Sequence, residues 1–315
     1  MNAKQLTIFT SIDRDRIGEC RARGEFFWLD LTSPSEEQIV ELGEFFGLHE
    51  LAVEDTRKFD QRPKIEPYGE YAFMVFFGVH LLDGEPTPLE VHAFVHGDYM
   101  ITVHREDCVE LDGLRVRLQR SAAGVEMLVI YRVLDALTDS FFPLLASLDD
   151  EIDTLADDIV AKENKEHLQR IFELKRMLVQ LRRVVSPQRD MMARAADQLL
   201  GLPGLEVDAH DYFRDVYDHM IRISEMIDTN RELLTGTVDL YLSTAANRQN
   251  EEMKQLTVMA SIFLPLAFIV GFFGQNFRWM VDHIDSRTDF LIYGIGSLVV
   301  STVVLMAYFK RRRYW

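Results

Sequence analysis

The chain has 315 residues and a formal net charge of −17, from 51 acidic against 34 basic side chains. This balance argues against nucleic acid as a partner, because nucleic-acid binding needs basic patches that meet phosphates. The two cysteines, Cys20 and Cys108, show no disulfide or metal spacing and indicate a reducing compartment. The acidic excess attracts cations, although on its own it serves solubility.

The first part of the chain, to about residue 105, is predicted to be a mixed α/β domain. The run Ser33-Pro34-Ser35-Glu36-Glu37, with a capping serine, a proline and acids, is typical of a helix start, and a second short helix is expected over roughly His49–Thr56. Runs rich in aromatic and β-branched residues predict strands. These runs are Leu6–Ser11, Phe26–Leu31, Tyr71–Leu82, Leu89–His96 and Tyr99–His104. We therefore expect a small sheet with helices packed against it.

From about Glu110 helical periodicity dominates. One long helix is predicted over Gly124–Ala161 and a return helix from Asn164 to about Leu200, ended by the breaker Gly201–Gly204. The acidic segment Asp149–Asp158 lies in the first of these helices. It has no ligand set at fixed spacing, so a solvated helix face is favoured over a metal site.

A third helical segment starts near Asp208 and has no strong breaker before the apolar stretch that follows. Apolar residues with one polar member recur there at alternating steps of four and three, which is a heptad seam. The seam comprises Val216, Met220, Ile223, Ile227, Asn230 and Leu234, and continues with a one-residue phase shift through Val238, Tyr241 and Ala245. The seam predicts that this helix packs along its length against copies of itself or against neighbouring helices. A helix of about 65 residues, roughly 100 Å long, is rarely stable alone, so its length implies an oligomer.

Two apolar stretches follow that are long enough to cross a membrane. The first, Gln255–Phe273, has 19 residues and as a helix spans roughly 29 Å, the thickness of the hydrocarbon core. The second, Phe290–Phe309, is followed at once by the basic run Lys310–Arg313, which predicts a cytoplasmic end. The first residues contain no apolar segment typical of a signal peptide. We expect a multi-pass protein of the cell membrane (a bacterial inner membrane) with both termini in the cytoplasm.

The expected organisation has six parts. They are a cytoplasmic α/β and helical domain over residues 1–205, a cytoplasmic stalk helix over 206–254, a first transmembrane helix over 255–276, an external loop over 277–289, a second transmembrane helix over 290–309 and a basic cytoplasmic tail over 310–315.

The first span ends in Gly274-Gln275-Asn276, a small residue followed by two neutral amides. Behind this tripeptide, one helical face is small near its outer end and apolar further in. That face contains Asn250, Met253, Leu256, Ala260, Leu264, Ala267 and Gly271. In a symmetric ring it would line an axis, where the Asn276 amide could accept hydrogen bonds from the water of a hydrated Mg²⁺. The span alone favours a plain anchor with an asparagine cap.

The sequence resembles the CorA family of divalent-cation channels, whose first span ends in Gly-Met-Asn. The resemblance covers essentially the whole chain. Family-like segments are Leu51–Asp55, Gln61–Lys64, Asp149–Asp153, Leu174–Arg176 with Leu181–Arg183, Tyr212–His219, Val238–Leu242, Lys254–Phe277 and the basic tail.

The resemblance implies a funnel-shaped homopentamer in which the long helix is the stalk and the first span lines the pore. Asn276, with Gly274 and Gln275, then forms the selectivity motif, and the face described above matches pore-lining positions. Asp239 matches an acidic ring at the cytoplasmic end of the pore. Asp55 and Asp215 match the positions of two acids that, in family members that sense cytoplasmic Mg²⁺, face one another across neighbouring subunits, where bound metal holds the pore shut; the resemblance implies the same regulatory metal site here. The divalent ion is cargo and regulator, and no other cofactor is implied.

Gln275 departs from the family's methionine and leaves the identity of the ion open. A Mg²⁺ channel that also passes Co²⁺ or Ni²⁺ is favoured by Asp55 and Asp215. A Zn²⁺ transporter of the same architecture is the alternative, and His283 in the external loop would suit this softer ion. A non-conducting, membrane-anchored coiled-coil scaffold is the alternative from another class. No catalytic motif points to an enzyme.

Overall fold

The computed structural model describes residues 6–82, 85–120, 126–162, 164–199, 202–203, 210–275, 278–283 and 286–312. The chain divides into two compact units, Met1–Val238 and Asp239–Trp315, and each is described by itself.

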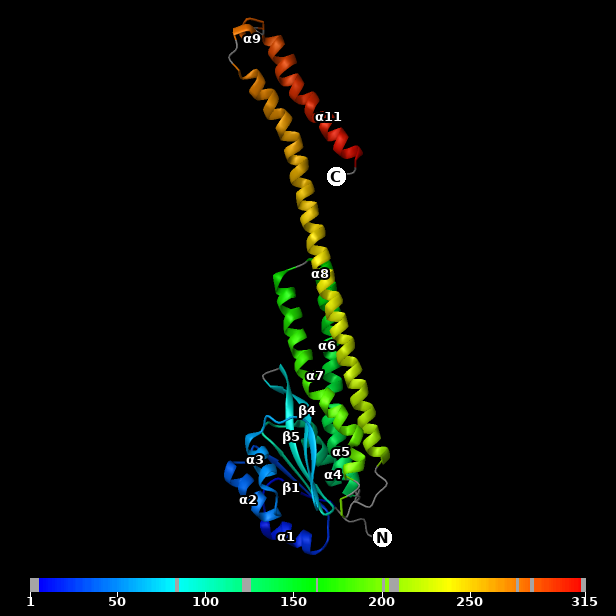
Figure 1. Cartoon of the computed structure of the whole chain (residues 1–315). Coiled ribbons are helices and arrows are strands. Elements are labelled where there is room, and N and C mark those ends of the chain that lie inside the picture. The colour runs from blue at the N-terminus through cyan, green and yellow to red at the C-terminus, as the bar shows by residue number, and fades with distance from the viewer. Residues whose placement is uncertain are drawn as a thin grey trace. The chain divides into compact units, whose positions relative to one another are not determined.

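The first unit is built on a six-stranded mixed sheet (Figure 1). Its strands are β1 (Thr7–Phe9), β2 (Phe27–Thr32), β3 (Lys64–Tyr68), β4 (Tyr71–Leu82), β5 (Glu85–His96) and β6 (Tyr99–His104). The spatial order is β1-β2-β6-β5-β4-β3. β2 pairs in parallel with β1 and β6, whereas β3, β4, β5 and β6 form antiparallel neighbours. The predicted strands are confirmed, and β3 is a strand that the sequence did not predict.

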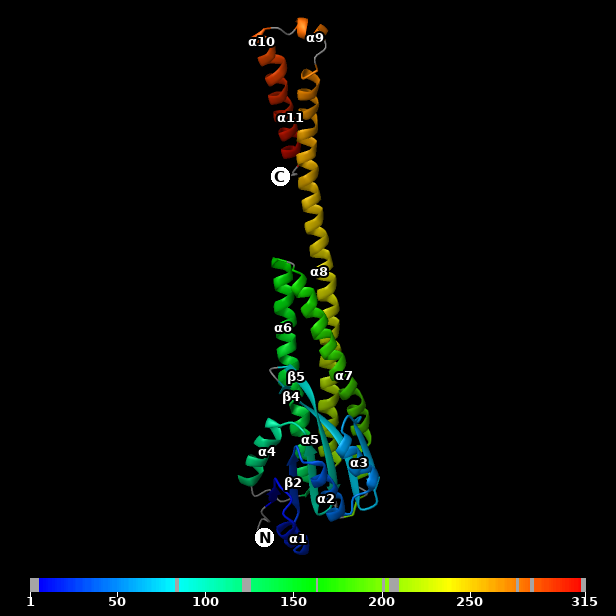
Figure 2. The same cartoon turned by 90° about the vertical axis from the view of Figure 1, so that its left-hand side faces the viewer.

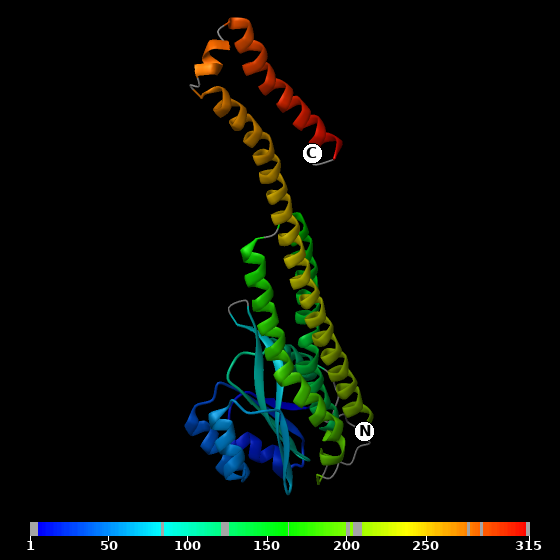
Figure 3. The same ribbon diagram turned by 45° about the horizontal axis from the view of Figure 1, so that its top comes forward.

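Three helices cover one face of this sheet: α1 (Arg14–Ala22), α2 (Glu36–Phe46) and α3 (Glu50–Lys58). Figure 3 shows the sheet between these helices and the longer helices of the unit. The predicted helix start is confirmed: Ser35 caps α2, and it does so through a capping box with Gln38. The sequence did not predict α1, because this helix is largely polar and buries only Ile17 and Cys20.

Five helices continue the chain beyond the sheet: α4 (Val109–Arg120), α5 (Glu126–Asp139), α6 (Phe141–Ala161), α7 (Lys165–Leu199) and α8 (His210–Phe273). α6 and α7 form an antiparallel pair (Figure 2). The prediction of one helix over Gly124–Ala161 is wrong, because the helix is interrupted at Ser140, between α5 and α6. The Ser140 hydroxyl donates to the Leu137 carbonyl and accepts the backbone N–H of Val79 at 2.8 Å.

The edge of β4 beyond the end of β3 is covered by side chains in place of a strand. The Gln188 side chain on α7 accepts from the backbone N–H of Phe77 at 2.7 Å and donates to its carbonyl at 3.0 Å. Ser140 meets the next N–H on the same edge, that of Val79. Because an unpaired sheet edge leaves polar groups unsatisfied, these contacts fix α5, α6 and α7 against the sheet.

The heptad seam of α8 is buried within the chain. All six of its residues from Val216 to Leu234 are 3% exposed or less. The polar member, Asn230, donates to the carbonyl of Leu145 on α6 at 3.3 Å. The predicted continuity of the helix is confirmed, since α8 has 64 residues. These six residues pack against the chain's own helices, so they carry no evidence for an oligomer.

The second unit holds the rest of α8 with α9 (Arg278–His283), α10 (Arg287–Asp289), the π-helical segment η1 (Phe290–Gly296) and α11 (Ser297–Arg311). Two helical stretches, ending at Phe273 and at Arg311, are long and apolar enough to cross a membrane, and almost none of their apolar windows is buried inside the chain. The segment expected to be a loop over 277–289 is partly helical in its described residues, as α9 and α10.

Candidate functional site

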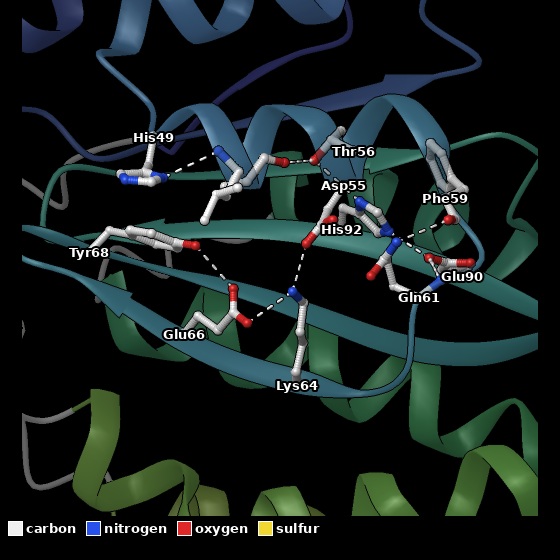
Figure 4. Close-up of polar contacts among 12 residues, drawn as sticks. His49, Asp55, Thr56, Phe59, Gln61, Lys64, Glu66, Tyr68, Glu90 and His92 are labelled. Carbon is white, nitrogen blue, oxygen red and sulfur yellow. Dashed lines mark hydrogen bonds and ion pairs between the residues drawn. The ribbon is translucent and has the colours of Figure 1, made fainter.

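Asp55, a predicted regulatory ligand, lies on α3 opposite the first residue of β3. Its Oδ2 lies 2.7 Å from Nζ of Lys64, which also lies 3.0 Å from Oε1 of Glu66 (Figure 4). Burial on its own would lower the pKa of Lys64, but the hydrogen bonds and charges of Asp55 and Glu66 outweigh it and raise that pKa. The carboxylate of Asp55 is therefore held by a charged lysine in this structure.

The half-buried carboxylate of Glu90 supports the turn between α3 and β3. Phe59 and Asp60 adopt positive φ angles of 55° and 60°, a conformation that non-glycine residues rarely take. The Glu90 carboxylate accepts hydrogen bonds from the backbone N–H groups of Asp60 and Gln61 at 2.8 and 2.9 Å, and from the ring nitrogen Nε2 of His92 at 2.6 Å. These charge-assisted bonds fix the position of α3, and therefore of Asp55, relative to β3.

Asp215, the second predicted regulatory ligand, lies in the second turn of α8. Its Oδ2 accepts a hydrogen bond from the Tyr131 hydroxyl on α5 at 2.8 Å. Burial, followed by that bond to a carboxylate, raises the pKa of Tyr131. Oδ1 of Asp215 faces Nε2 of His219 at 4.0 Å. Asp215 thus belongs to a polar cluster that joins α5 to α8.

The same cluster contains a group of side chains that could hold a metal ion. Ligand atoms of Asp135, Asp139 and His219 all lie within 4.8 Å of one another. Nδ1 of His219 lies 3.4 Å from Asp135 and 3.6 Å from Asp139. Burial, and then the neighbouring Asp139 charge, raises the pKa of Asp135. Oxygen and imidazole ligands of this kind suit Mg²⁺, Co²⁺ or Zn²⁺.

The sequence analysis missed this group, although a signal was present. Asp135 and Asp139 are four residues apart, as are Asp215 and His219, so each pair shares one helix face. Neither pair indicates a site by itself. Only the packing of α5 against α8 brings the two faces together.

Asp55 and Asp215 do not meet within the chain. Among the described contacts, no hydrogen bond or ion pair joins them; Asp55 contacts Lys64, and Asp215 contacts Tyr131 and His219. Figure 1 shows α3 and the first turns of α8 on opposite sides of the sheet. A metal bridge between these two carboxylates therefore requires two copies of the chain.

The predicted pore-lining residues are all exposed along α8. Among them, Met253, Leu256 and Leu264 have relative exposures of 57%, 63% and 75%, and Asn250, Ala260, Ala267 and Gly271 are also in the exposed class, as is Asp239. Apolar residues on other faces, such as Phe263 and Phe268, are equally exposed. Exposure therefore leaves this surface available to a partner helix, lipid or a pore without choosing between them.

The predicted selectivity tripeptide, Gly274-Gln275-Asn276, begins directly after the last turn of α8. The backbone N–H groups of Gly274 and Gln275 donate to the carbonyls of Val270 and Phe272 at 2.9 and 3.3 Å. Gly274 and Gln275 are both exposed. Asn276 lies outside the described residues, so its predicted role stays a prediction.

His283 ends the short helix α9. Its Nδ1 donates to the carbonyl of Trp279 at 2.9 Å, and the two rings stack with centroids 4.6 Å apart. Among the residues that the structure describes, no metal-ligand group includes His283. The described part of the chain gives this histidine a packing role and no second ligand for zinc.

Comparison with known proteins gives consistent matches. The family model described as CorA-like Mg²⁺ transporter protein matches residues 23–311. The chain is 33% identical to the cobalt/magnesium transport protein CorA of Thermotoga maritima, over 91% of this chain and 83% of that protein. It is 23% identical to the zinc transport protein ZntB of Yersinia enterocolitica, over 78% and 73% of the two chains.

A solved structure shows the same fold. The complete structure of the CorA magnesium transporter from Methanocaldococcus jannaschii matches with a TM-score of 0.79, 21% identity and coverage of 90% of each chain. The match includes the α/β unit, the long helix and the apolar helices at the carboxyl end.

Proposed function

Because this chain belongs to the CorA-like Mg²⁺ transporter family, it is a divalent-metal transporter of the membrane and not an enzyme, and we propose that it is a homopentameric channel whose main ion is Mg²⁺. The observation that supports Mg²⁺ most is the 33% identity to a cobalt/magnesium transport protein across 91% of the chain. Co²⁺ and Ni²⁺ are minor cargo in this proposal.

The pore in this proposal is lined by the exposed face of α8 from Asn250 to Gly271, with Asp239 as an acidic ring at its cytoplasmic end. Five copies bring these faces to one axis. Gly274, Gln275 and Asn276 form the external mouth, where neutral amide oxygens bind the water shell of Mg²⁺ weakly enough for the ion to leave again. Both termini lie in the cytoplasm of a cell whose inner membrane holds the pentamer, since Lys310 and Arg311 follow the second span.

The gate in this proposal is a metal bridge between Asp55 and the partner subunit's Asp215. Two carboxylates repel one another until a divalent ion joins them, so cytoplasmic Mg²⁺ biases the subunits toward one arrangement. The separation of the two residues within a single chain supports a bridge between copies. The polar cluster around Asp215 supplies further oxygen and nitrogen atoms beside it.

Flux into proteoliposomes that contain the full chain tests the conducting role. We expect Mg²⁺ uptake driven by membrane potential, and loss of uptake or of selectivity in Asn276→Ala. Ser301→Ala in the second span is the control and should conduct normally. Intact selective flux in Asn276→Ala would remove the proposed role of this residue.

The same assay separates the alternative functions. Uptake of Zn²⁺ in preference to Mg²⁺, and only with a pH gradient, would identify a zinc transporter, for which the 23% identity to a zinc transport protein is the supporting observation. Absence of flux for every divalent ion would favour a non-conducting scaffold.

A further inference from the structure

The ammonium group of Lys64 pairs with one oxygen of the Asp55 carboxylate. Nζ lies 2.7 Å from Asp55 Oδ2, and the side chains of both residues are only 25% exposed. Nζ also lies 5.3 Å from the centroid of the Phe73 ring, a distance at which a cation is attracted to the ring face. Asp55 on α3, Glu66 on β3 and Phe73 on β4 therefore hold this charge in place. The predicted metal ligand Asp55 is already paired with a cation.

A second carboxylate is within reach of the same lysine. Lys64 and Glu66 lie two residues apart on β3, so their side chains share one face of the strand. Oε1 of Glu66 accepts from Nζ at 3.0 Å, while Oε2 accepts from the Tyr68 hydroxyl at 3.1 Å (Figure 4). If Lys64 leaves Asp55, its ammonium keeps Glu66 as a partner and is not stranded in a partly buried place.

A divalent ion and the lysine are competitors for Asp55. Each needs the carboxylate oxygens, and two cations held on one side of a carboxylate repel one another. Lysine is a compact point charge on a flexible stem, so it can retract without unfolding the strand that carries it. Occupation of Asp55 by metal therefore includes the release of Lys64 toward Glu66.

We propose that Lys64 is a tethered counter-ion of the regulatory site, which competes with cytoplasmic Mg²⁺ for Asp55 and so raises the Mg²⁺ concentration that closes the channel. This inference rests on the proposed sensor role of Asp55. It gives the lysine a positioning and threshold-setting role, with no contact to the transported ion. When the cytoplasmic Mg²⁺ concentration falls, Lys64 returns to Asp55 and neutralises the negative charge that would otherwise retain the last Mg²⁺ ions.

The test measures the cytoplasmic-side Mg²⁺ concentration that half-inhibits flux through the full chain in proteoliposomes. Lys64→Met keeps the apolar stem over Phe73 and removes the charge. We expect half-inhibition at a Mg²⁺ concentration about three- to fivefold lower, the size of a partly exposed ion pair. Lys64→Arg keeps the charge and should stay near the wild-type value. Arg57→Met removes an equal charge from α3, where Arg57 pairs with Glu36, and should leave the threshold unchanged.

The outcomes distinguish this inference from the sensor proposal. Asp55→Asn is measured in parallel; if it leaves inhibition unchanged, the sensor proposal itself fails. If Asp55→Asn weakens inhibition but Lys64→Met leaves it unchanged or weakens it too, Lys64 serves only to orient Asp55 and the competition is overturned. Thermal unfolding in detergent over a Mg²⁺ titration reports binding without flux, and Lys64→Gln is the second variant should Lys64→Met fold poorly.

Discussion

The hydroxyl of Tyr131 on α5 donates a hydrogen bond to Asp215 on α8 across 2.8 Å. The two residues are 84 positions apart, and their contact places the Asp215 carboxylate at the end of a polar row that continues through His219 to Asp135. A change in the charge at Asp215 would therefore alter a contact between α5 and α8, as the proposed gating role of Asp215 requires.

Removal of both proposed bridge ligands should weaken inhibition by cytoplasmic Mg²⁺. In Asp55→Ala with Asp215→Ala the ion has no carboxylate pair to join, so the concentration for half-inhibition should rise about tenfold. Flux in proteoliposomes measures this value. Asp218→Ala, an exposed acid on the same helix, is the matched control, and unchanged inhibition in the double variant would place the sensor elsewhere.

The cluster beside Asp215 should respond to both pH and metal. Because the pKa of Asp135 is raised by burial and by Asp139, its contribution to stability is present at low pH and is lost as pH rises through the folded-state pKa. Asp135→Asn should stabilise the metal-free protein at pH 7 by about 0.5 kcal/mol or more and flatten that dependence. It should also reduce the stabilisation produced by added Mg²⁺ or Co²⁺.

Thermal unfolding of the detergent-solubilised chain, with and without each ion, measures these effects. Asp150→Asn on the exposed face of α6 is the control and should behave as wild type. If Asp135→Asn is stabilised by metal as strongly as the wild type, Asp135 is not a ligand.

Much of the fold follows from sequence pattern, because its elements are set by local periodicity. The aromatic and β-branched runs of β4 and β6, the helix start with a capping serine before α2 and the uninterrupted helical pattern of α8 are local signals, and each is confirmed. The break at Ser140 is different. It depends on an N–H of β4 that lies 61 residues away in sequence, so no local pattern marks it.

The candidate sites show the same division. Asp55 and Asp215 were predicted from family-like motifs, but the partners that define their chemistry, Lys64 and Tyr131, come from other elements. The heptad seam predicted packing correctly but not its partner, because apolar spacing is the same for a helix that meets its own chain and one that meets a copy.

Glu90 should be needed for the shape of the turn that follows α3, the helix that carries Asp55. Glu90→Gln loses the carboxylate that accepts hydrogen bonds from two backbone N–H groups and from the ring nitrogen Nε2 of His92. Phe59 and Asp60 therefore lose support for their positive φ angles. We expect a destabilisation of about 2 kcal/mol and weaker inhibition by Mg²⁺. Glu44→Gln on α2, an exposed acid, is the control. Chemical denaturation and the inhibition assay measure the two effects, and a stable variant with normal inhibition would contradict this role.

His104 should make the stability of the first unit fall as pH rises. It is 1% exposed, and its Nε2 lies 3.1 Å from the fully buried Asp30 while its Nδ1 donates to the carbonyl of Glu106 at 2.6 Å. Burial alone would lower the pKa of His104, but these two acceptors outweigh it and raise that pKa. Burial likewise opposes ionisation of Asp30, yet His104, Thr102 and Arg115 lower its pKa.

The directions of the two pKa shifts define the pH range in which His104 and Asp30 stabilise the first unit. The His104 contribution is complete below its ordinary pKa of 6.5 and is lost as pH rises through the folded-state value, whereas the Asp30 contribution is present above 3.8 and is lost on acidification. His104→Gln should therefore lower stability by about 2 kcal/mol near pH 6 and flatten the decline toward pH 8.5. Melting temperatures between pH 5.5 and 8.5 test this, with His80→Gln as the control, since His80 has no ion pair among the described residues. A His104→Gln variant that keeps the wild-type slope would show that another group titrates.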